Sequence, residues 1–175
     1  MKFQRLIAAT ALIGAAGLVL SACAGGGGST ESGSAAADTI NTELWYAPTN
    51  FDPALASGSS DVSVARLGFD TLLRLGETDG YIGGLATDWS AVSGSEYTFT
   101  IREDATCSDG TVITPSIVAA SLEYLATSED SAAQSSKATV FGPGTPPFTA
   151  DDDANMLTIE LSEPYSELLD GLTTE

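Results

Sequence analysis

The chain has 175 residues and carries 24 acidic side chains, 6 basic side chains and no histidine, so its formal net charge is −18. Such an acidic surface repels nucleic acid and anionic lipid, which makes both poor partners. We attribute the acidity to the solubility of an exported protein. The lack of histidine excludes Ser-His and Cys-His nucleophile pairs and most zinc sites.

The N-terminal segment is typical of an export signal. Lys2 and Arg5 give it a positive start, and the apolar run of 15 residues that follows, 6–20, is shorter than the roughly 20 residues that span a bilayer. We therefore predict a signal peptide over residues 1–22. The sequence LSAC, which ends at Cys23, resembles the lipobox of bacterial lipoproteins, and this resemblance implies lipid modification of Cys23. The alternative is an ordinary signal peptide with an incidental cysteine.

Residues 23–38 are predicted to form a lipidated flexible linker. Residues 24–38 contain five glycines, three serines and four alanines, a composition that cannot bury enough apolar surface to fold. Such a tether would hold the domain roughly 20 Å from the membrane. The folded part is then residues 39–175. Removal of Lys2 and Arg5 with the signal leaves 4 basic residues against 24 acidic ones, a net charge of −20.

The first half of the folded part mixes strands and helices. Residues 42–47 are rich in β-formers and predict a strand that runs into a loop at Pro48. Residues 60–75 predict a helix with Ser60 as N-cap; its apolar face would consist of Val62, Ala65, Phe69, Leu72 and Leu73. A turn-rich break follows at 76–84, and a short element at 85–89. Tyr97, Phe99 and Ile101 alternate with polar residues, as in a half-buried strand.

The second half begins with the stretch TCSDGTVITP, residues 106–115. Asp109-Gly110 predicts a turn, and Thr114-Pro115 predicts the start of a helix that extends to Leu125. The apolar face of this helix would be Ile117, Val118, Ala120, Leu122 and Leu125. Residues 142–147 are irregular, 148–161 predict two strands joined by an acidic turn, and 164–172 predict a closing helix that buries Leu168, Leu169 and Leu172.

The candidate chemical groups have structural interpretations. Asp151, Asp152 and Asp153 could bind calcium, but they lack the glycine bend and the later glutamate of a calcium loop, so we expect an ordinary turn. Cys107 has no histidine to activate it. We expect a buried thiol, or one half of a disulfide with a cysteine outside this chain. There is no G-x-S-x-G motif for a hydrolase. We expect no enzyme activity, no metal and no cofactor.

Five segments in a fixed order resemble family 5 of the extracellular solute-binding proteins, the peptide- and nickel-binding class of bacterial ABC importers. They are NFDPALA (50–56), ARLGFDTLLRL (65–75), GGLATDWS (83–90), YTFTIREDATCSDGTVITPSIVAASLEYL (97–125) and LTIELSEPYSELLDGL (157–172). Cys107 departs from the family pattern because a large apolar residue is usual there. Ser116 and Ile117 depart as well, because they replace an acidic first helical turn that would favour the helix N-terminus.

The resemblance implies an α+β (mixed α/β) fold, the N-terminal part of a type II periplasmic-binding-protein fold. Family members are several hundred residues long. Residues 39–175 are therefore expected to be an incomplete solute-binding domain, with the first strand of one lobe and an accessory subdomain. The second lobe and the hinge would lie beyond this chain.

The resemblance also implies a function. The protein would capture extracellular peptides, or a similar solute, and deliver them to the permease subunits of an ABC transporter while its lobes close over the ligand. It would be anchored by Cys23 to the outer face of the bacterial cytoplasmic membrane. The expected ligand contacts are Tyr46, Ala47, Pro48, Thr49 and Asn50, which could equally form a plain connecting loop. The alternative function is a stand-alone membrane-anchored interaction module without a role in transport.

Overall fold

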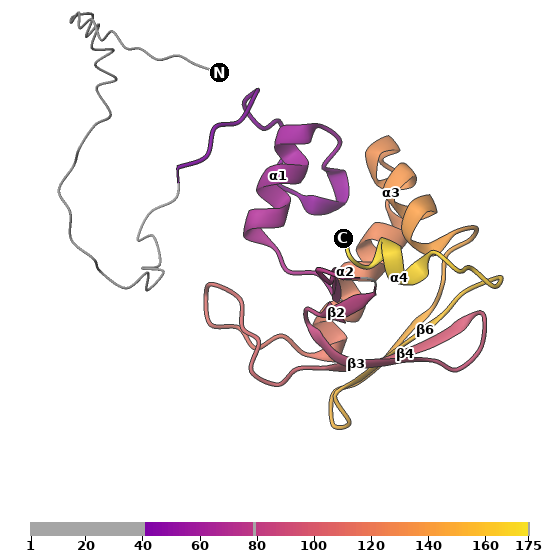
Figure 1. Ribbon diagram of the computed structural model, residues 1–175. Helices are drawn as coiled ribbons and strands as arrows, with labels where there is room; N and C mark the ends of the chain where they lie inside the picture. Colours follow the sequence, from indigo (N-terminus) through magenta and orange to yellow (C-terminus); the bar gives the residue numbers. More distant parts are fainter. Residues whose placement is uncertain (1–40, 79, 175) are drawn as a thin grey trace, which may run out of the picture. The chain divides into compact units, whose positions relative to one another are not determined.

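A computed structural model describes residues 41–78 and 80–174 (Figure 1). It confirms the mixed α/β fold class. The helices are η1 (Pro53–Leu55), α1 (Ser59–Gly68), α2 (Pro115–Thr127), α3 (Ser131–Phe141) and α4 (Leu168–Gly171). The strands are β1 (Leu73–Leu75), β2 (Tyr81–Gly83), β3 (Ala86–Ala91), β4 (Glu96–Ile101), β5 (Phe148–Asp151) and β6 (Met156–Glu160). The predicted signal peptide, Cys23 and the linker to residue 38 lie outside the described residues.

The main sheet has four antiparallel strands in the order β3-β4-β6-β5. β4 confirms the predicted strand, since Tyr97, Phe99 and Ile101 are buried and the residues between them are half-buried. Phe99 lies opposite Leu157 of β6, and both side chains are almost inaccessible to solvent. The β5–β6 hairpin confirms the two strands predicted around the acidic turn.

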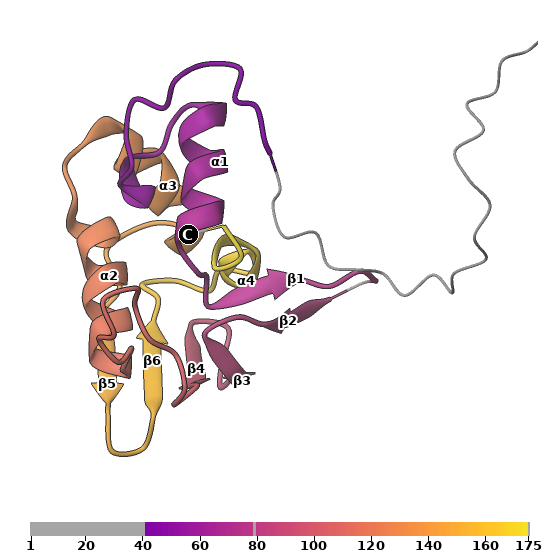
Figure 2. The same ribbon diagram turned by 90° about the vertical axis from the view of Figure 1, so that its left-hand side faces the viewer.

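Helix α2 contacts β5 and β6 of this sheet and also packs against α3 (Figure 2). Thr114 is its N-cap residue and Pro115 occupies the first turn, as predicted. The buried side chains fall at helical spacing on one stripe, Val118, Leu122, Leu125 and Ala126. The predictions for Ile117 and Ala120 were wrong. Both are exposed, because they project about 100° and 200° away from Val118 around the helix.

The strand predicted at residues 42–47 is not formed. Within the described residues, this segment is not paired with another strand, and its one hydrogen bond to the domain joins the Tyr46 amide to Ser60 Oγ at 3.4 Å. A strand needs a neighbouring strand to satisfy its backbone groups. The β-rich composition is therefore insufficient to produce a strand here.

The helix predicted over residues 60–75 ends at Gly68. Leu72 and Leu73 are buried as expected, but neither lies in a helix. Leu72 has no regular secondary structure, and Leu73 begins β1, which pairs with β2 to form a small hairpin. The Leu72 carbonyl accepts from the amides of Gly84 and Ala86, both at 3.0 Å. Part of the segment 76–84, predicted as a turn-rich break, forms strand β2. The long-range hydrogen bonds of Leu72, and not the helical spacing of the apolar residues, determine the local backbone conformation.

The closing helix is shorter than predicted, but the expected residues anchor it. α4 spans Leu168–Gly171, and the side chains of Leu168 and Leu172 are fully buried. The Leu73 amide donates to the Leu172 carbonyl at 3.2 Å. This bond joins the end of the described chain to the β1–β2 hairpin. No helix among residues 41–78 and 80–174 has the length and apolar character needed to span a membrane.

Candidate functional site

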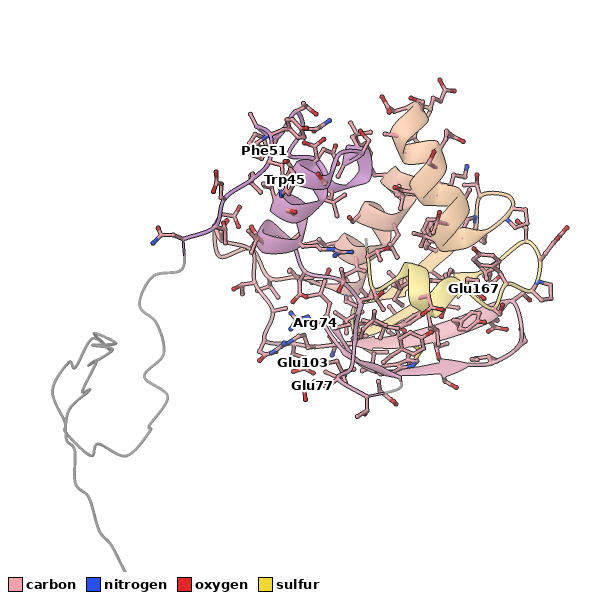
Figure 3. The ribbon with its side chains drawn as sticks, turned by 45° about the horizontal axis from the view of Figure 1, so that its top comes forward. Trp45, Phe51, Arg74, Glu77, Glu103 and Glu167 are labelled. Carbon is pink, nitrogen blue, oxygen red and sulfur yellow. The ribbon has the colours of Figure 1, made fainter. Side chains whose placement is uncertain are left out.

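The predicted ligand loop, residues 46–50, precedes η1 and carries exposed aromatic side chains. Tyr46 is 74% exposed, and its neighbour Trp45 is 89% exposed. Phe51, on the other side of the loop, is 64% exposed. Figure 3 labels Trp45 and Phe51, which both lie beside α1. Aromatic rings of this kind provide a large contact area for a solute, because an exposed ring gains free energy when it is covered.

Asp61, in the first turn of α1, holds this loop. Its Oδ1 accepts the Thr49 amide at 2.7 Å and the Asn50 amide at 3.3 Å, while its Oδ2 accepts the Thr49 hydroxyl at 2.9 Å. The Asp61 side chain is covered, with 3% of the residue exposed. The hydrogen bond from the Thr49 amide lowers the pKa of the Asp61 carboxyl below its ordinary value, and burial opposes that shift only in part.

The end of the loop is fixed by a second carboxylate, that of Asp52. The Asp52 amide donates to Asn50 Oδ1 at 2.9 Å, and Asp52 Oδ1 accepts the Ala54 amide at 3.0 Å, which caps η1. Asp52 Oδ2 accepts the hydroxyl of Tyr124 on α2 at 2.8 Å. This hydrogen bond raises the pKa of Tyr124. The C-terminal end of the loop is therefore tied to α1 through Asp61 and to α2 through Asp52.

The structure thus brings Thr49 and Asn50 together on one carboxylate, and leaves Tyr46 exposed. Ala47 is exposed and Pro48 is half-buried. Beside the loop lies a shallow hollow of about 470 Å³, which is lined by Glu43, Leu44, Trp45, Ser59, Ser60 and Ser63. One aromatic ring, the serine hydroxyl groups and one carboxylate can contact a solute there.

Sequence reasoning missed the role of Ser60 and Asp61. It assigned Ser60 as the N-cap of the helix, but the N-cap position is occupied by Gly58, and both Ser60 and Asp61 are buried against the loop. The signal that the sequence offers is a Ser-Asp pair in a first helical turn; the burial that makes this pair need partners from elsewhere in the chain is seen only in the structure. The partners themselves are 11 to 14 residues away.

A second cavity, of about 430 Å³, lies between the α1–β1 connection, the 106–113 turn region and α2. Cys107 lines it and is exposed, so the expectation of a buried thiol was wrong. The reason is local. The predicted Asp109-Gly110 turn is present, and Cys107 makes its backbone hydrogen bonds to Thr111 and Gly110 within it, outside the core. The disulfide with a cysteine outside this chain stays a prediction.

The acidic run at the β5–β6 turn has structural partners. Asp151 Oδ1 accepts the Ala154 amide at 2.9 Å within the turn. Asp152 Oδ1 accepts the Ser116 amide at 2.8 Å in the first turn of α2. The acidic group that the sequence of this helix lacks is thus supplied by the neighbouring hairpin. Among the described residues, Cys, Asp and Glu side chains form no group of three or more that could hold a metal ion.

Comparison with known proteins adds the family context. Residues 80–174, more than half of the chain, match the sequence model of the bacterial extracellular solute-binding proteins, family 5 Middle. The periplasmic murein peptide-binding protein MppA of Escherichia coli K12 is 36% identical over 67 residues, which are 38% of this chain and 12% of that protein.

Two solved structures extend the similarity. A substrate-binding protein from Microbacterium hydrocarbonoxydans, complexed with 4-hydroxybenzoate hydrazide, is 39% identical with a TM-score of 0.67, over 73% of this chain and 25% of that one. A nickel ABC transporter structure from Bacillus halodurans is 26% identical with a TM-score of 0.58, over 74% of this chain and 25% of that one. The chain therefore matches 12% of the curated relative's length and a quarter of each solved chain.

Proposed function

The chain belongs to family 5 of the bacterial extracellular solute-binding proteins, and on this premise we propose that it is part of the substrate-binding component of an ABC importer. It captures extracellular peptides, or a similar solute, and delivers them to the permease in the membrane. The family match over residues 80–174 is the observation that carries the proposal. The similarity to a murein peptide-binding protein favours peptides as the ligand. The role is binding and delivery, without a chemical step.

In this proposal, residues 46–50 contact the solute. The loop is fixed on α1 and α2 through Asp61 and Asp52, while Tyr46 remains accessible. A fixed loop loses little conformational entropy when a ligand binds to it. Extended peptides bind to other proteins through backbone hydrogen bonds and side-chain pockets, and an aromatic ring adds contact area. Closure of two lobes over the solute would couple binding to docking on the permease.

Replacement of Tyr46 tests this contact. Tyr46→Ala should weaken the binding of the best peptide from a library of tri- to pentapeptides by about tenfold, as expected for loss of an aromatic contact. Affinity is measured by calorimetry on the protein expressed from its complete reading frame. Val92→Ala, an exposed apolar residue in the β3–β4 turn region, is the control and should leave affinity unchanged.

Equal affinity of Tyr46→Ala and the unaltered protein would exclude Tyr46 from the site. If the unaltered protein retains no peptide of the library, peptides of three to five residues are excluded as its ligand, and a similar solute and the stand-alone interaction module stay as the alternatives.

We also propose that Cys23 carries the lipid anchor, at the outer face of the cytoplasmic membrane, with residues 24–38 as the tether. The sequence LSAC supports this proposal. Cys23→Ser should release the protein from the membrane fraction into the soluble fraction, because a serine cannot form the thioether to the lipid. Fractionation and intact-mass measurement check the result. A Cys107→Ser control should remain in the membrane fraction. Membrane association of Cys23→Ser equal to that of the control would contradict the anchor.

A further inference from the structure

We propose that Asp61 is a positioning residue for solute binding: it holds residues 46–50 in the conformation that presents Tyr46. This inference rests on the proposed function. Asp61 itself would not touch the solute, because its two oxygens face the loop and only 3% of the residue is exposed.

The Asp61 carboxylate matches three hydrogen-bond donors of the loop. The two shorter hydrogen bonds come from Thr49, whose amide lies 2.7 Å from Oδ1 and whose hydroxyl lies 2.9 Å from Oδ2, and the Asn50 amide adds a third at 3.3 Å. Hydrogen bonds to an ionised acceptor are stronger than those between neutral groups. Both oxygens are used, so the carboxylate fixes the direction of the loop as well as its distance from α1.

Within the part of the chain that the structure describes, the buried charge of Asp61 has no basic partner. The ion pairs of residues 41–78 and 80–174 join Arg74 to Asp70 and Arg102 to Asp104, and neither involves Asp61. A buried carboxylate needs donors to compensate for the water that it loses. The loop supplies them here. Departure of the loop would exchange these donors for water, so the loop is held by the difference between three hydrogen bonds to an ionised acceptor and the hydration that replaces them.

The attachment of the loop to Asp61 also prepares its exposed aromatic side chains for binding. Trp45, Tyr46 and Phe51 are exposed on or beside a loop that is tied at Asp61 and, through Asp52, at Tyr124. Ordering a residue of free chain costs about 1–2 kcal/mol of conformational entropy. A loop that is ordered beforehand avoids this cost when solute binds. Loss of Asp61 should therefore weaken the contact between Tyr46 and the solute, although the Tyr46 ring itself is unchanged.

Two substitutions separate geometry from charge. Asp61→Ala removes both acceptor oxygens. Asp61→Asn keeps one oxygen for the amides of Thr49 and Asn50, and its new NH₂ group can donate to the Thr49 hydroxyl, which can accept. The asparagine should therefore restore most of what alanine removes. Asp109→Asn is the matched control, because Asp109 accepts the Thr111 amide at 2.9 Å in a different turn.

The first measurement is amide hydrogen exchange, followed by mass spectrometry on the protein expressed from its complete reading frame. In Asp61→Ala, exchange should rise at least tenfold in the peptides that contain Thr49 and Asn50 and stay unchanged in peptides from α2. Asp61→Asn should exchange close to the unaltered protein, and Asp109→Asn should leave the loop unchanged. Unaltered exchange of the loop in Asp61→Ala would overturn the proposal without any reference to a ligand.

The second measurement is a double-mutant cycle with Tyr46→Ala, read as affinity for the best peptide of the tri- to pentapeptide library. Asp61→Ala should weaken binding about tenfold when Tyr46 is present and less than twofold when it is absent, because Asp61 acts through the loop. An equal effect in both backgrounds would indicate general destabilisation and overturn the positioning role.

The outcomes for Asp61 and for the proposed function are distinguishable. If Tyr46→Ala weakens binding and Asp61→Ala does not, Asp61 has no positioning role while the ligand contact stands. If Tyr46→Ala has no effect, the proposed ligand contact fails, and the positioning role fails with it. If Asp61→Ala does not fold, Thr49→Val replaces it, since this substitution removes only the hydroxyl bond to Oδ2. Unchanged affinity of Thr49→Val would then count against the proposal.

Discussion

At the scale of single residues, the role of a carboxylate here follows from the amide groups that reach it. Asp61 receives the amides of a loop, Asp109 receives the Thr111 amide within its own turn, and Asp152 receives the Ser116 amide of α2. The pKa of Asp61 is lowered chiefly by the Thr49 amide, and the pKa of Asp109 chiefly by the Thr111 amide. Such bonds favour the ionised form, so they stabilise the fold only while these groups remain charged.

These lowered pKa values predict loss of stability in acid. The carboxyls of Asp61 and Asp109 have lower pKa values in the folded protein than the ordinary 3.8. Their stabilisation is thus complete above the unfolded pKa and is lost as the pH falls through the lowered folded pKa. The free energy of unfolding should therefore decrease as the pH falls below about 4, as measured by urea denaturation.

Asp109→Asn should make this decrease less steep, because it removes one of the titrating groups. A pH profile of Asp109→Asn with the same slope as the unaltered protein would contradict the prediction.

At the scale of elements, the contact between α3 and α4 depends on a glycine. A Cβ atom added to Gly171 would lie 2.6 Å from Val140 Cα, closer than real Cβ atoms approach backbone. Val140 of α3 and Leu168 of α4 are both fully buried beside this contact. The small residue thus allows the short helix α4 to approach α3 and to insert Leu168 and Leu172 into the core.

Gly171→Ala should therefore destabilise the protein by about 1–3 kcal/mol, the usual cost of overpacking a core. Urea denaturation measures the change. Gly68→Ala is the matched control. It also lies at the end of a helix, where no atom comes within 4 Å of the added Cβ, and alanine should be neutral or stabilise the protein by up to about 1 kcal/mol. Equal stability of the two variants would show that α4 can shift without cost.

At the scale of the whole molecule, one core joins the sheet to the helices. It contains Leu73 of the β1–β2 hairpin, Phe99 and Leu157 of the sheet, and Phe141 of α3. The chain corresponds to a quarter of each of two solved family structures. Closure of two lobes over the solute therefore stays a proposal. Measurements of affinity therefore use the protein expressed from its complete reading frame.

The family and the local elements could be derived from the sequence, because their signals lie within a few neighbouring residues. The alternation of Tyr97, Phe99 and Ile101 determines β4, and Thr114 with Pro115 determines the start of α2. The Asp109-Gly110 turn is equally local; Gly110 has a φ of 87°, which glycine adopts without strain.

The tertiary structure decided what depends on distant partners. The apolar residues up to Leu73 fit a helix in the sequence, but strand β2 and the Leu172 carbonyl place Leu73 in a strand. The candidate loop was identified from the sequence, whereas its attachment to Asp61, 12 residues from Thr49, was not. Asp152 reaches Ser116 across 36 residues. A buried polar group needs a hydrogen-bond partner. The sequence does not show which residue is that partner, because only the packing of the chain brings the two residues together.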